Sequence, residues 1–350
     1  MGDFWRNRRV LVSGASGFIG SNLVRGLLDM GADVVGLDRV KESPSLRALG
    51  AEVEILARDV RNHNRLAWTL VNGNGSPEWR PPAVVFHLAG MSHPRDCQAN
   101  PLQAWETNVQ GTWAILEACR TLPGLMAVVC ASSDRVYGSL GKAPVPILPD
   151  GRRAYAAVKQ DSSRAAWLED DAPTQTEVYG LSKACADLLA RAYAALGLPV
   201  ATLRHQNTFG PADPHRSHIV TGTIYGLLDG QVPVIYGDGT TIKGYLHIQD
   251  VCHAYMLLAE ALMAGQIASG SPVNAAGTPC SVLALVELLI QIGGQAVIPR
   301  ILGEDLSQSG EVEILDDSRL RSLGWIPKPL EEGLSNTYNW YKEHRAWLSP

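Results

Sequence analysis

Tyr179 and Lys183 have the spacing of a proton-transfer pair. They stand at positions i and i+4 of a helix predicted over 178–197, so their side chains share one face of that helix. A tyrosine has a reference pKa of about 10 and is a poor base at neutral pH. A neighbouring ammonium favours the phenolate and lowers that pKa. The pair predicts a base for an alcohol proton, and Ser133 is the candidate for a hydroxyl on the same substrate oxygen.

A second tyrosine and lysine, Tyr155 and Lys159, repeat this spacing. Two observations favour Tyr179. It opens the helix that leads directly into a strand predicted over 199–205, and the turn-like residues 169–173 precede it. Tyr179 is therefore the predicted base.

Polar side chains crowd the end of an apolar run earlier in the chain. Residues 126–130 (MAVVC) fit a buried strand, and Ser132, Ser133, Asp134 and Arg135 follow it at once. Ligands of parallel sheets bind at the carboxyl ends of the strands, so we expect this cluster to meet a substrate. An ion pair between Asp134 and Arg135 that closes the strand end is the alternative interpretation.

A glycine-rich turn, GASGFIG at 14–20, follows the first predicted strand and opens the first helix. Gly14 permits the tight turn, Gly17 lets the backbone approach a pyrophosphate, and Gly20 lets helix and strand pack closely. The helix N-terminus attracts the anion. Asp38 ends the second strand, near the spacing of about 20 residues at which a carboxylate meets an adenosine ribose.

Asp38 also bears on which dinucleotide is bound. Its carboxylate would repel a 2′-phosphate, which favours NAD over NADP, although the adjacent Arg39 weakens that inference. A strand-end cap is the structural alternative for Asp38. Asp59 and Val60 follow the third predicted strand and are expected to meet the adenine.

The elements that must position these residues alternate along the chain. Strands are predicted over 8–14, 32–38, 51–57, 83–90, 125–132 and 199–205, and helices over 18–30, 45–50, 62–72, 101–120 and 178–197. Strands that are apolar almost throughout and separated by helices indicate a parallel sheet covered on both faces. We therefore expect a Rossmann-like, doubly wound α/β fold.

The chain divides into two expected parts. Residues 1–211 form the dinucleotide-binding part, with an insertion at about 139–168. After residue 211 the predicted elements become shorter. Residues 212–350 are therefore expected to form mainly a smaller substrate-binding lobe, interleaved with the sheet.

Composition excludes several classes of function. The 350 residues carry a formal net charge of −5 with a pI near 6.0, which gives nucleic acid or anionic lipid no basic field to recognise. No signal-peptide stretch or membrane-spanning window is visible, so we expect a cytoplasmic protein with no membrane partner. Six scattered cysteines without a C-x-x-C pair predict buried, reduced thiols, and no metal site is predicted.

Several stretches together resemble the extended short-chain dehydrogenase/reductases, specifically the nucleotide-sugar epimerase/dehydratase family. They are GASGFIG (14–20), Asp38, Asp59-Val60, HLAG (87–90), WETNVQGT (105–112), SSDRVYG (132–138), YGLSK (179–183), LRHQNTFGP (203–211), IYGDGTTIKGYLHIQDV (235–251) and LGWIPKPLEEGL (323–334). The resemblance covers nearly the whole chain. It implies an enzyme that uses NAD and acts on a nucleotide-diphosphate sugar.

The resemblance also implies roles for individual residues. The catalytic set would be Tyr179, Lys183, Ser133 and Asp134. The cofactor would be bound by Gly14, Ser16, Gly17, Phe18, Ile19, Gly20, Asp38, Arg39, Asp59, Val60, Leu88, Ala89, Gly90, Ser92 and Asn108, with Tyr179 and Lys183. The substrate would be bound by Ser133, Asp134, Arg135, Asn207 and Lys243.

Lys243 and Gly244 depart from the family pattern, which usually has Arg-Asp before its aromatic residue. A lysine keeps the positive charge but loses the bidentate fork of an arginine. Phosphate binding at Lys243 is therefore expected with altered geometry.

Asp134 and Arg135 bear on the reaction. Family members that remove water use an acid matching Asp134 to protonate the departing hydroxyl, and commonly carry a glutamate base where Arg135 stands. A guanidinium stays protonated and cannot be that base. The branch that acts on CDP-glucose has lysine there, so elimination is not excluded. C4 epimerisation needs only Tyr179, Ser133 and NAD and is the main prediction. A 4,6-dehydration is the alternative, ahead of a reductase or a non-catalytic NAD-binding scaffold.

A homodimer is also expected by resemblance, through the helices at 101–120 and 178–197. Its candidate stripe is Trp105, Val109, Trp113 and Leu116. Burial of this stripe against the sheet explains it nearly as well. The loop at 212–222 is expected to be a solvated turn rather than a nucleotide contact.

Overall fold

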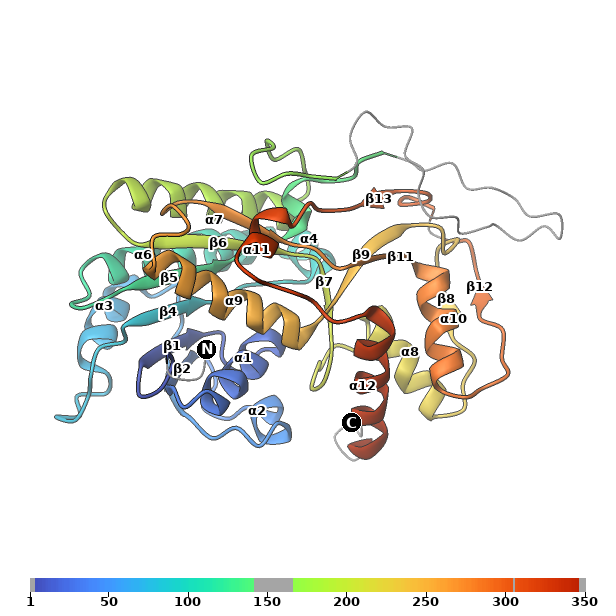
Figure 1. Ribbon diagram of the computed structural model, residues 1–350, viewed down its shortest axis with the longest axis horizontal. Coiled ribbons are helices and arrows are strands. Elements are labelled where there is room, and N and C mark those ends of the chain that lie inside the picture. The colour runs from blue at the N-terminus through green and yellow to red at the C-terminus, as the bar shows by residue number, and fades with distance from the viewer. Residues whose placement is uncertain (1–3, 142–165, 305, 346–350) are drawn as a thin grey trace.

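The computed structural model describes residues 4–141, 166–304 and 306–345. Figure 1 follows the chain from its N-terminus in blue to its C-terminus in red. Most of the predicted insertion at 139–168, with the alternative pair Tyr155 and Lys159, lies outside the described residues.

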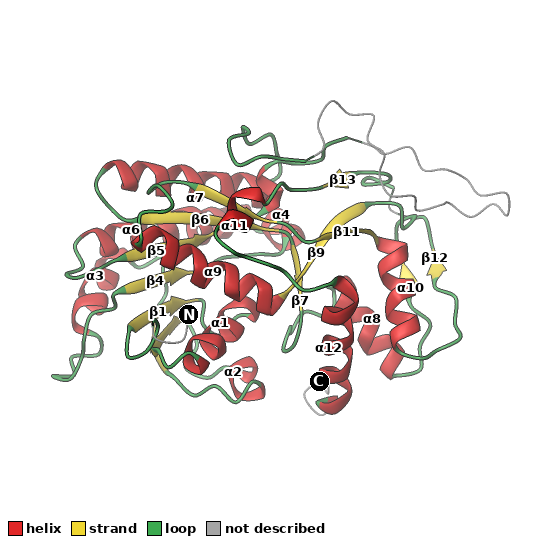
Figure 2. Ribbon diagram, in the orientation of Figure 1, coloured by secondary structure: helices red, strands yellow, loops and turns green. Residues whose placement is uncertain are grey.

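Seven parallel strands form the main sheet, in the order β3-β2-β1-β4-β5-β6-β10. They are β1 (Arg9–Ser13), β2 (Asp33–Asp38), β3 (Glu54–Ala57), β4 (Val84–His87), β5 (Ala127–Ala131), β6 (Val200–His205) and β10 (Pro272–Ala275). Figure 2 shows β1, β4, β5 and β6 of this sheet in yellow, with red helices around them. Ser13 at the end of β1 is level with Leu37 on one side and with His87 on the other, so the carboxyl ends share one edge. The predicted Rossmann-like, doubly wound α/β fold is confirmed.

The helices cover both faces of this sheet and build the second lobe. They are α1 (Phe18–Asp29), α2 (Pro44–Ala48), α3 (His63–Asn72), α4 (Pro94–Ala99), α5 (Pro101–Ala104), α6 (Gly111–Arg120), α7 (Val178–Ala195), α8 (Ile219–Leu228), α9 (Ile248–Met263), α10 (Val282–Ile292), α11 (Ser318–Ser322) and α12 (Leu330–Glu343). No helix among the described residues is long and apolar enough to cross a bilayer.

Alternate side chains of a strand face opposite helix layers, because the side-chain period of a strand is two residues. Val10 and Val12 of β1 belong to the core shared with α1 and α9. Leu11, between them, belongs to the core shared with α3, α6 and α7. Both faces are buried, which explains why the strands are apolar almost throughout.

The strand β10 is not among the predicted strands. It comes from the second half of the chain and pairs in parallel with β6, where Pro272 is level with Thr202. Its four residues begin with a proline and include the buried Asn274, so they give little strand signal. The helix α9 precedes it and packs on α1. Residues beyond 211 therefore complete the main sheet and one of its helix layers.

The smaller lobe is built around β9, which pairs with β11 in antiparallel fashion and with β7 and β13 in parallel. Its strands are β7 (Asn207–Phe209), β8 (Val234–Ile235), β9 (Ile242–His247), β11 (Thr278–Ser281), β12 (Arg300–Ile301) and β13 (Val312–Glu313). Its core joins α8, α10 and α12, which lie beside one another in Figure 1.

The helix predicted over 101–120 contains one irregular turn. Residues Trp105–Gln110 form a π-helix between α5 and α6. Such turns occur frequently at functional sites. Here it carries Asn108, whose side chain is buried.

The six cysteines are free thiols, as predicted. Four of them are buried, but Cys185 and Cys280 are only half-buried, which corrects the expectation that all six lie in the core.

Candidate active site

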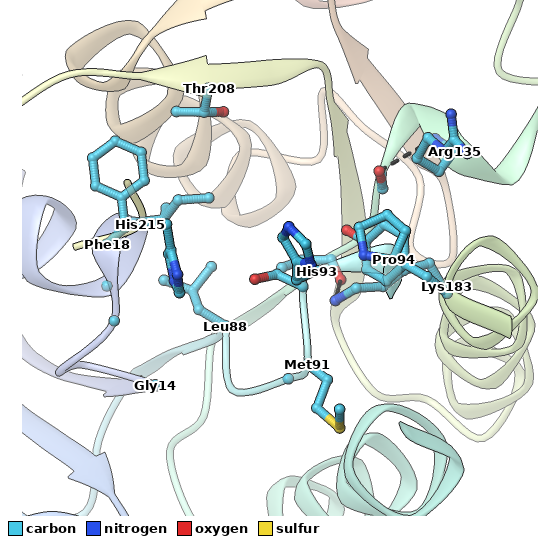
Figure 3. A pocket seen from close by; sticks show the side chains of 18 of the residues that line it. Gly14, Phe18, Leu88, Met91, His93, Pro94, Arg135, Lys183, Thr208 and His215 are labelled. Carbon is cyan, nitrogen blue, oxygen red and sulfur yellow. Dashed lines mark hydrogen bonds between the residues drawn. The ribbon is translucent and has the colours of Figure 1, made fainter. Parts of the chain in front are cut away.

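A cavity of about 820 Å³ runs along the carboxyl ends of the main sheet. Figure 3 shows Gly14 and Phe18 at one end of it, and Arg135 and Lys183 at the other. With the exception of Asn108, every predicted site residue lines it: Gly14, Ser16, Gly17, Phe18, Ile19, Gly20, Asp38, Arg39, Asp59, Val60, Leu88, Ala89, Gly90, Ser92, Ser133, Asp134, Arg135, Tyr179, Lys183, Asn207 and Lys243. We call the end at Gly14 the coenzyme end and the end at Arg135 the sugar end.

The glycine turn has no room for side chains. Gly14 has a φ of 72°, which favours glycine, and a Cβ there would lie 2.7 Å from the backbone nitrogen of Ala89. A Cβ on Gly20 would lie 2.0 Å from the carbonyl oxygen of Gly14. The turn leads into the N-terminus of α1, with Gly17 as its N-cap. A tight backbone cradle at a helix N-terminus fits a dinucleotide pyrophosphate.

Two carboxylates are held in place near this turn. The backbone N–H of Ser16 donates to Oδ2 of Asp38 at 3.0 Å, and that of Arg39 donates to Oδ1 at 2.7 Å. Arg61 pairs with Asp59 at 2.7 Å, and this hydrogen bond lowers the pKa of Asp59. The coenzyme end therefore offers fixed acceptors for the hydroxyls of a ribose.

Tyr179, Lys183 and Ser133 meet toward the sugar end. Lys183 Nζ donates to the carbonyl oxygen of Ala131 at 3.1 Å, and burial lowers the pKa of Lys183. Tyr179 is 7% exposed. Burial raises the pKa of Tyr179, and a hydrogen bond with Ser133 opposes that shift. In the protein by itself the phenol is thus harder to ionise than expected from the sequence, because desolvation outweighs the effect of the hydrogen bond with Ser133.

Glu177 fixes the beginning of α7, which carries Tyr179. Its carboxylate accepts hydrogen bonds from the backbone N–H of Tyr179 at 2.9 Å and of Gly180 at 2.7 Å. Gly180 packs so closely on the turn after β5 that a Cβ would lie 2.5 Å from the carbonyl oxygen of Arg135. Close packing of these two segments brings Tyr179 to Ser133.

Asp134 is a buried carboxyl in a short 3₁₀ turn, Asp134–Val136. Ser133 Oγ donates to its Oδ1 at 3.0 Å, and its Oδ2 has no hydrogen-bond partner among the described residues. Burial, followed by the charge of Glu313, raises the pKa of Asp134 to about 6. Asp134 can therefore hold a proton closer to neutral pH than an ordinary aspartate.

Arg135 and Lys243 share one carboxylate, Glu313. Arg135 Nη1 donates to Glu313 Oε1 at 2.8 Å, and Lys243 Nζ lies 3.4 Å from Glu313 Oε2. The predicted ion pair between Asp134 and Arg135 is not formed as a direct contact, because the guanidinium is turned to Glu313 and Glu177. Glu313 is not among the predicted site residues, because it lies in a two-residue strand outside every motif.

Asn108 lies behind the cavity wall rather than in it. Its Oδ1 accepts from the backbone N–H of Met91 at 2.7 Å, and its Nδ2 donates to Ser182 Oγ at 2.8 Å. It therefore ties the loop after β4 to α7. In this position Asn108 supports the loop that lines the cavity, and its predicted contact with the cofactor stays a prediction.

The glycine at position 244 is explained by the lack of space for a side chain there. A Cβ at this position would lie 1.8 Å from Oε1 of Gln206. Gln206 is itself anchored, since its Oε1 accepts from Gly277 N at 3.0 Å and its Nε2 donates to the carbonyl oxygen of Glu313 at 2.8 Å. The departure from the family pattern at Gly244 thus makes room for the amide of Gln206. The same strand leaves Lys243 lining the cavity.

Four histidines that are not among the predicted site residues, His93, His205, His215 and His218, also line the cavity. Burial lowers the pKa of His205 to about 4, so this ring is neutral at pH 7. His205 ends a predicted strand, and that position was a signal for it. No such signal marks His93 and His218, whose stacked rings have their centroids 6.3 Å apart.

The loop at 212–222 is a turn that borders the cavity. Residues 214–217 are exposed, as expected, but Asp213 is buried and pairs with His218 at 2.7 Å. His215 and Ser217 line the cavity. The expected solvated turn is therefore only part of its structure.

Comparisons with known proteins agree on one family. A model of the NAD dependent epimerase/dehydratase family matches residues 10–274. The dTDP-glucose 4,6-dehydratase of Streptomyces griseus is 31% identical over 97% of this chain and 96% of its own.

Solved structures match along the whole length as well. A double mutant of the dTDP-glucose 4,6-dehydratase DesIV from Streptomyces venezuelae, with NAD and DAU bound, has a TM-score of 0.75 at 28% identity and covers 97% of this chain and 98% of that one. The UDP-glucose 4-epimerase of Thermotoga maritima, solved with UDP-glucose, has a TM-score of 0.77 over 96% and 99% of the chains. At 23% identity it shows a shared fold alone.

Proposed function

Because the chain belongs to the NAD dependent epimerase/dehydratase family, we propose that it is a nucleotide-diphosphate-sugar epimerase that inverts C4 with NAD it keeps bound. Bound NAD would accept a hydride from C4 and return it to the other face of the same sugar. The glycine turn and Asp38 would hold the dinucleotide. Residues beyond 211, through Lys243 and the turn at 214–217, would supply much of the substrate contact.

The chain's own residues would handle the proton. Tyr179 Oη takes the proton of the C4 hydroxyl and later gives it back, while Ser133 Oγ donates to the same oxygen. Lys183, anchored on the carbonyl oxygen of Ala131 at 3.1 Å, keeps a positive charge beside the phenol. Burial keeps water away from Tyr179, and the positive charge of an oxidised nicotinamide would offset the effect of that burial on the phenol.

The observation that carries epimerisation is the set of acids in the cavity. Among the described residues that line it, Asp38 and Asp59 lie at the coenzyme end, and Asp134 is the one carboxylate near Tyr179. Elimination across C5 and C6 calls for a base as well as an acid. Arg135 stands beside Asp134 and stays protonated.

The test is turnover in D₂O without added NAD. The purified protein is incubated with UDP-glucose or dTDP-glucose, and the sugar is followed by NMR. An epimerase yields an inverted C4 without deuterium on carbon, because the hydride returns from the cofactor. Turnover that occurs only when NAD is added in a parallel reaction, and that consumes it in step with product, would contradict the proposal and indicate a net dehydrogenase.

A 4,6-dehydratase is the second candidate, on the observation that burial and Glu313 raise the pKa of Asp134 to about 6. A protonated Asp134 could donate to the departing C6 hydroxyl. The relative from Streptomyces griseus carries the name of that activity. This reaction would place deuterium at C5 in D₂O and form a 4-keto-6-deoxy sugar. Asp134→Asn would lower dehydration by about 10²-fold or more, and would leave C4 epimerisation within about tenfold of wild type.

We also propose a homodimer through α5 and α7. Leu102, Leu181 and Leu188 are exposed apolar residues on these helices. The predicted stripe is less suited, because Leu116 is fully buried and Trp113 packs against the core of α3 and α6. Sedimentation of wild type and of Leu188→Lys would test this contact, and a wild-type monomer would contradict it.

A further inference from the structure

Glu313 is a buried carboxylate that the proposed reaction does not use. It is 5% exposed and lies outside the set of residues that line the cavity. Its two oxygens contact two different cations, since Oε1 accepts from Arg135 Nη1 at 2.8 Å and Oε2 lies 3.4 Å from Lys243 Nζ. Both of these cations line the sugar end of the cavity. A single acid behind the wall is thus in contact with both.

The backbone around Glu313 is fixed independently of these charges. In the pairing of β13 with β9, Glu313 is level with Lys243. The carbonyl oxygen of Glu313 accepts a hydrogen bond from Gln206 Nε2 at 2.8 Å. The carboxylate is therefore presented from a rigid element, whereas Arg135 and Lys243 are long side chains with many rotamers. Their positions depend on the acid more than its position depends on them.

We propose that Glu313 is a positioning residue for the sugar end of the site, where it holds Arg135 and Lys243 in place. The inference deepens the proposed function and rests on it for the catalytic consequence. The ion contacts themselves do not depend on which sugar is bound.

Asp134 is the group through which the charge of Glu313 reaches the reaction. The titratable and charged groups that face it are Arg135 in its own turn, Lys243 on β9, Glu313 on β13, and Tyr179 and Glu177 at the beginning of α7. Burial and the charge of Glu313 raise the pKa of Asp134. The hydrogen bond from Ser133 and the positive charges of Arg135 and Lys243 lower it.

The protonation of Asp134 matters to the base. An ionised Asp134 raises the pKa of Tyr179, because it repels the phenolate. If Glu313 lost its charge, Asp134 would ionise at a lower pH, and Tyr179 would be harder to ionise near neutrality. Glu313 would thus favour a neutral Asp134 beside the phenolate that the reaction needs.

The test compares three variants. Glu313→Gln removes the charge, Glu313→Asp keeps it but withdraws the carboxylate by one methylene group, and Glu311→Gln makes the same charge change two residues away. Each protein is labelled with ¹³C-aspartate and titrated without any nucleotide sugar, and the Asp134 signal is identified by its loss in Asp134→Asn. We expect the Asp134 midpoint to fall by about one pH unit in Glu313→Gln and to stay in place in the other two.

The turnover of the same variants tests the positioning. Glu313→Asp is expected to lower kcat/KM for the nucleotide sugar by about 10- to 100-fold, because Arg135 and Lys243 move with the withdrawn carboxylate. Glu311→Gln should remain near wild type.

Either of two results would overturn the inference. One is an Asp134 midpoint that is the same in Glu313→Gln and wild type, or that moves as far in Glu311→Gln. The other is a Glu313→Asp variant with unchanged kcat/KM. If Glu313→Gln does not fold, Glu313→Asp still decides the positioning. A wild-type protein that turns over no nucleotide sugar would refute the proposed function, yet it would leave the titration of Asp134 to be judged by itself.

Discussion

The two ends of the cavity are built in different ways. At the coenzyme end, the glycine turn, Asp38 and the loop after β4 follow neighbouring strands, and backbone atoms hold them. At the sugar end, Arg135 is held by a group far along the chain, because it and its partner Glu313 are 178 residues apart. One end is fixed by close backbone packing, and the other by a set of mutually dependent charges.

This difference predicts how each end fails. Changes in side-chain volume should be most damaging at the coenzyme end, where a Cβ meets backbone atoms that cannot move. Changes in charge or pH should act mainly at the sugar end, where Asp134, Arg135, Lys243 and Glu313 influence one another.

The largest effect is expected at Tyr179, the predicted base toward the sugar end. Tyr179→Phe removes the base and should lower turnover by about 10³-fold, while the amount of NAD bound to the purified protein stays the same. Turnover and cofactor content are measured together. Tyr155→Phe, the change in the alternative pair, is the matched control and should keep full turnover. The opposite ranking would move the predicted base to Tyr155.

Gly20 tests the coenzyme end. A Cβ on Gly20 would lie 2.0 Å from the carbonyl oxygen of Gly14, whereas one on Gly17 would lie 3.3 Å from the same atom. Gly20→Ala should therefore destabilise the protein by about 3 kcal/mol in urea unfolding without NAD, and Gly17→Ala by much less. Equal losses for both alanines would mean that steric fit does not define this end.

Asp134 tests the sugar end through pH. Its pKa rises from 3.8 to about 6 on folding, so the folded protein binds this proton more tightly than the unfolded chain does. The contribution of Asp134 to stability therefore falls as pH rises from about 4 to about 6, and its full cost is present above that range. Asp134→Asn removes the titration. Relative to wild type it should be more stabilising at pH 7.5 than at pH 4.5, by about 2 kcal/mol. A difference from wild type that is equal at the two pH values would contradict the assignment.

Gly244 sharpens the comparison between the two ends, because a side chain at this position would test steric fit at the sugar end. Its Cβ would meet the end of a side chain, Gln206 Oε1, rather than backbone. The amide can swing away if it gives up its bonds to Gly277 and Glu313, so Gly244→Ala should cost only about 1–2 kcal/mol of unfolding free energy. In the background of Gln206→Ala the cost should nearly vanish. Additive losses in the double variant would rule out this contact as the reason for the glycine.

The coenzyme end of the cavity could be predicted from the sequence, whereas much of the sugar end could not. The glycine turn, Asp38 and the strands β1 to β6 have local signals: apolar runs, glycines at fixed offsets and a terminal acid. Tyr179 and Lys183 lie one helical turn apart and are equally local. Glu313 and Gln206 have no such signal, because their importance comes from contacts with segments distant in the chain. The raised pKa of Tyr179 could not be predicted from the sequence either, since it depends on the burial of this side chain in the fold.

Asn108 is an intermediate case. Its segment was recognised, but its position behind the wall depends on the π-helix over Trp105–Gln110, and the sequence analysis read this segment as part of one continuous helix. A helix predicted from periodicity alone would aim the same residue differently.

The place of β10 in the main sheet has a consequence for how the protein is made. The edge of β6 stays unpaired, and much of one apolar face stays uncovered, until α9 and the residues up to Ala275 have been synthesised. A nascent chain that already holds the complete glycine turn would still expose an unpaired, aggregation-prone strand edge to other chains on the same polysome. A pause in translation between residues 211 and 275 would therefore prolong the exposure of this edge and favour aggregation. That interval is where a chaperone would be needed most.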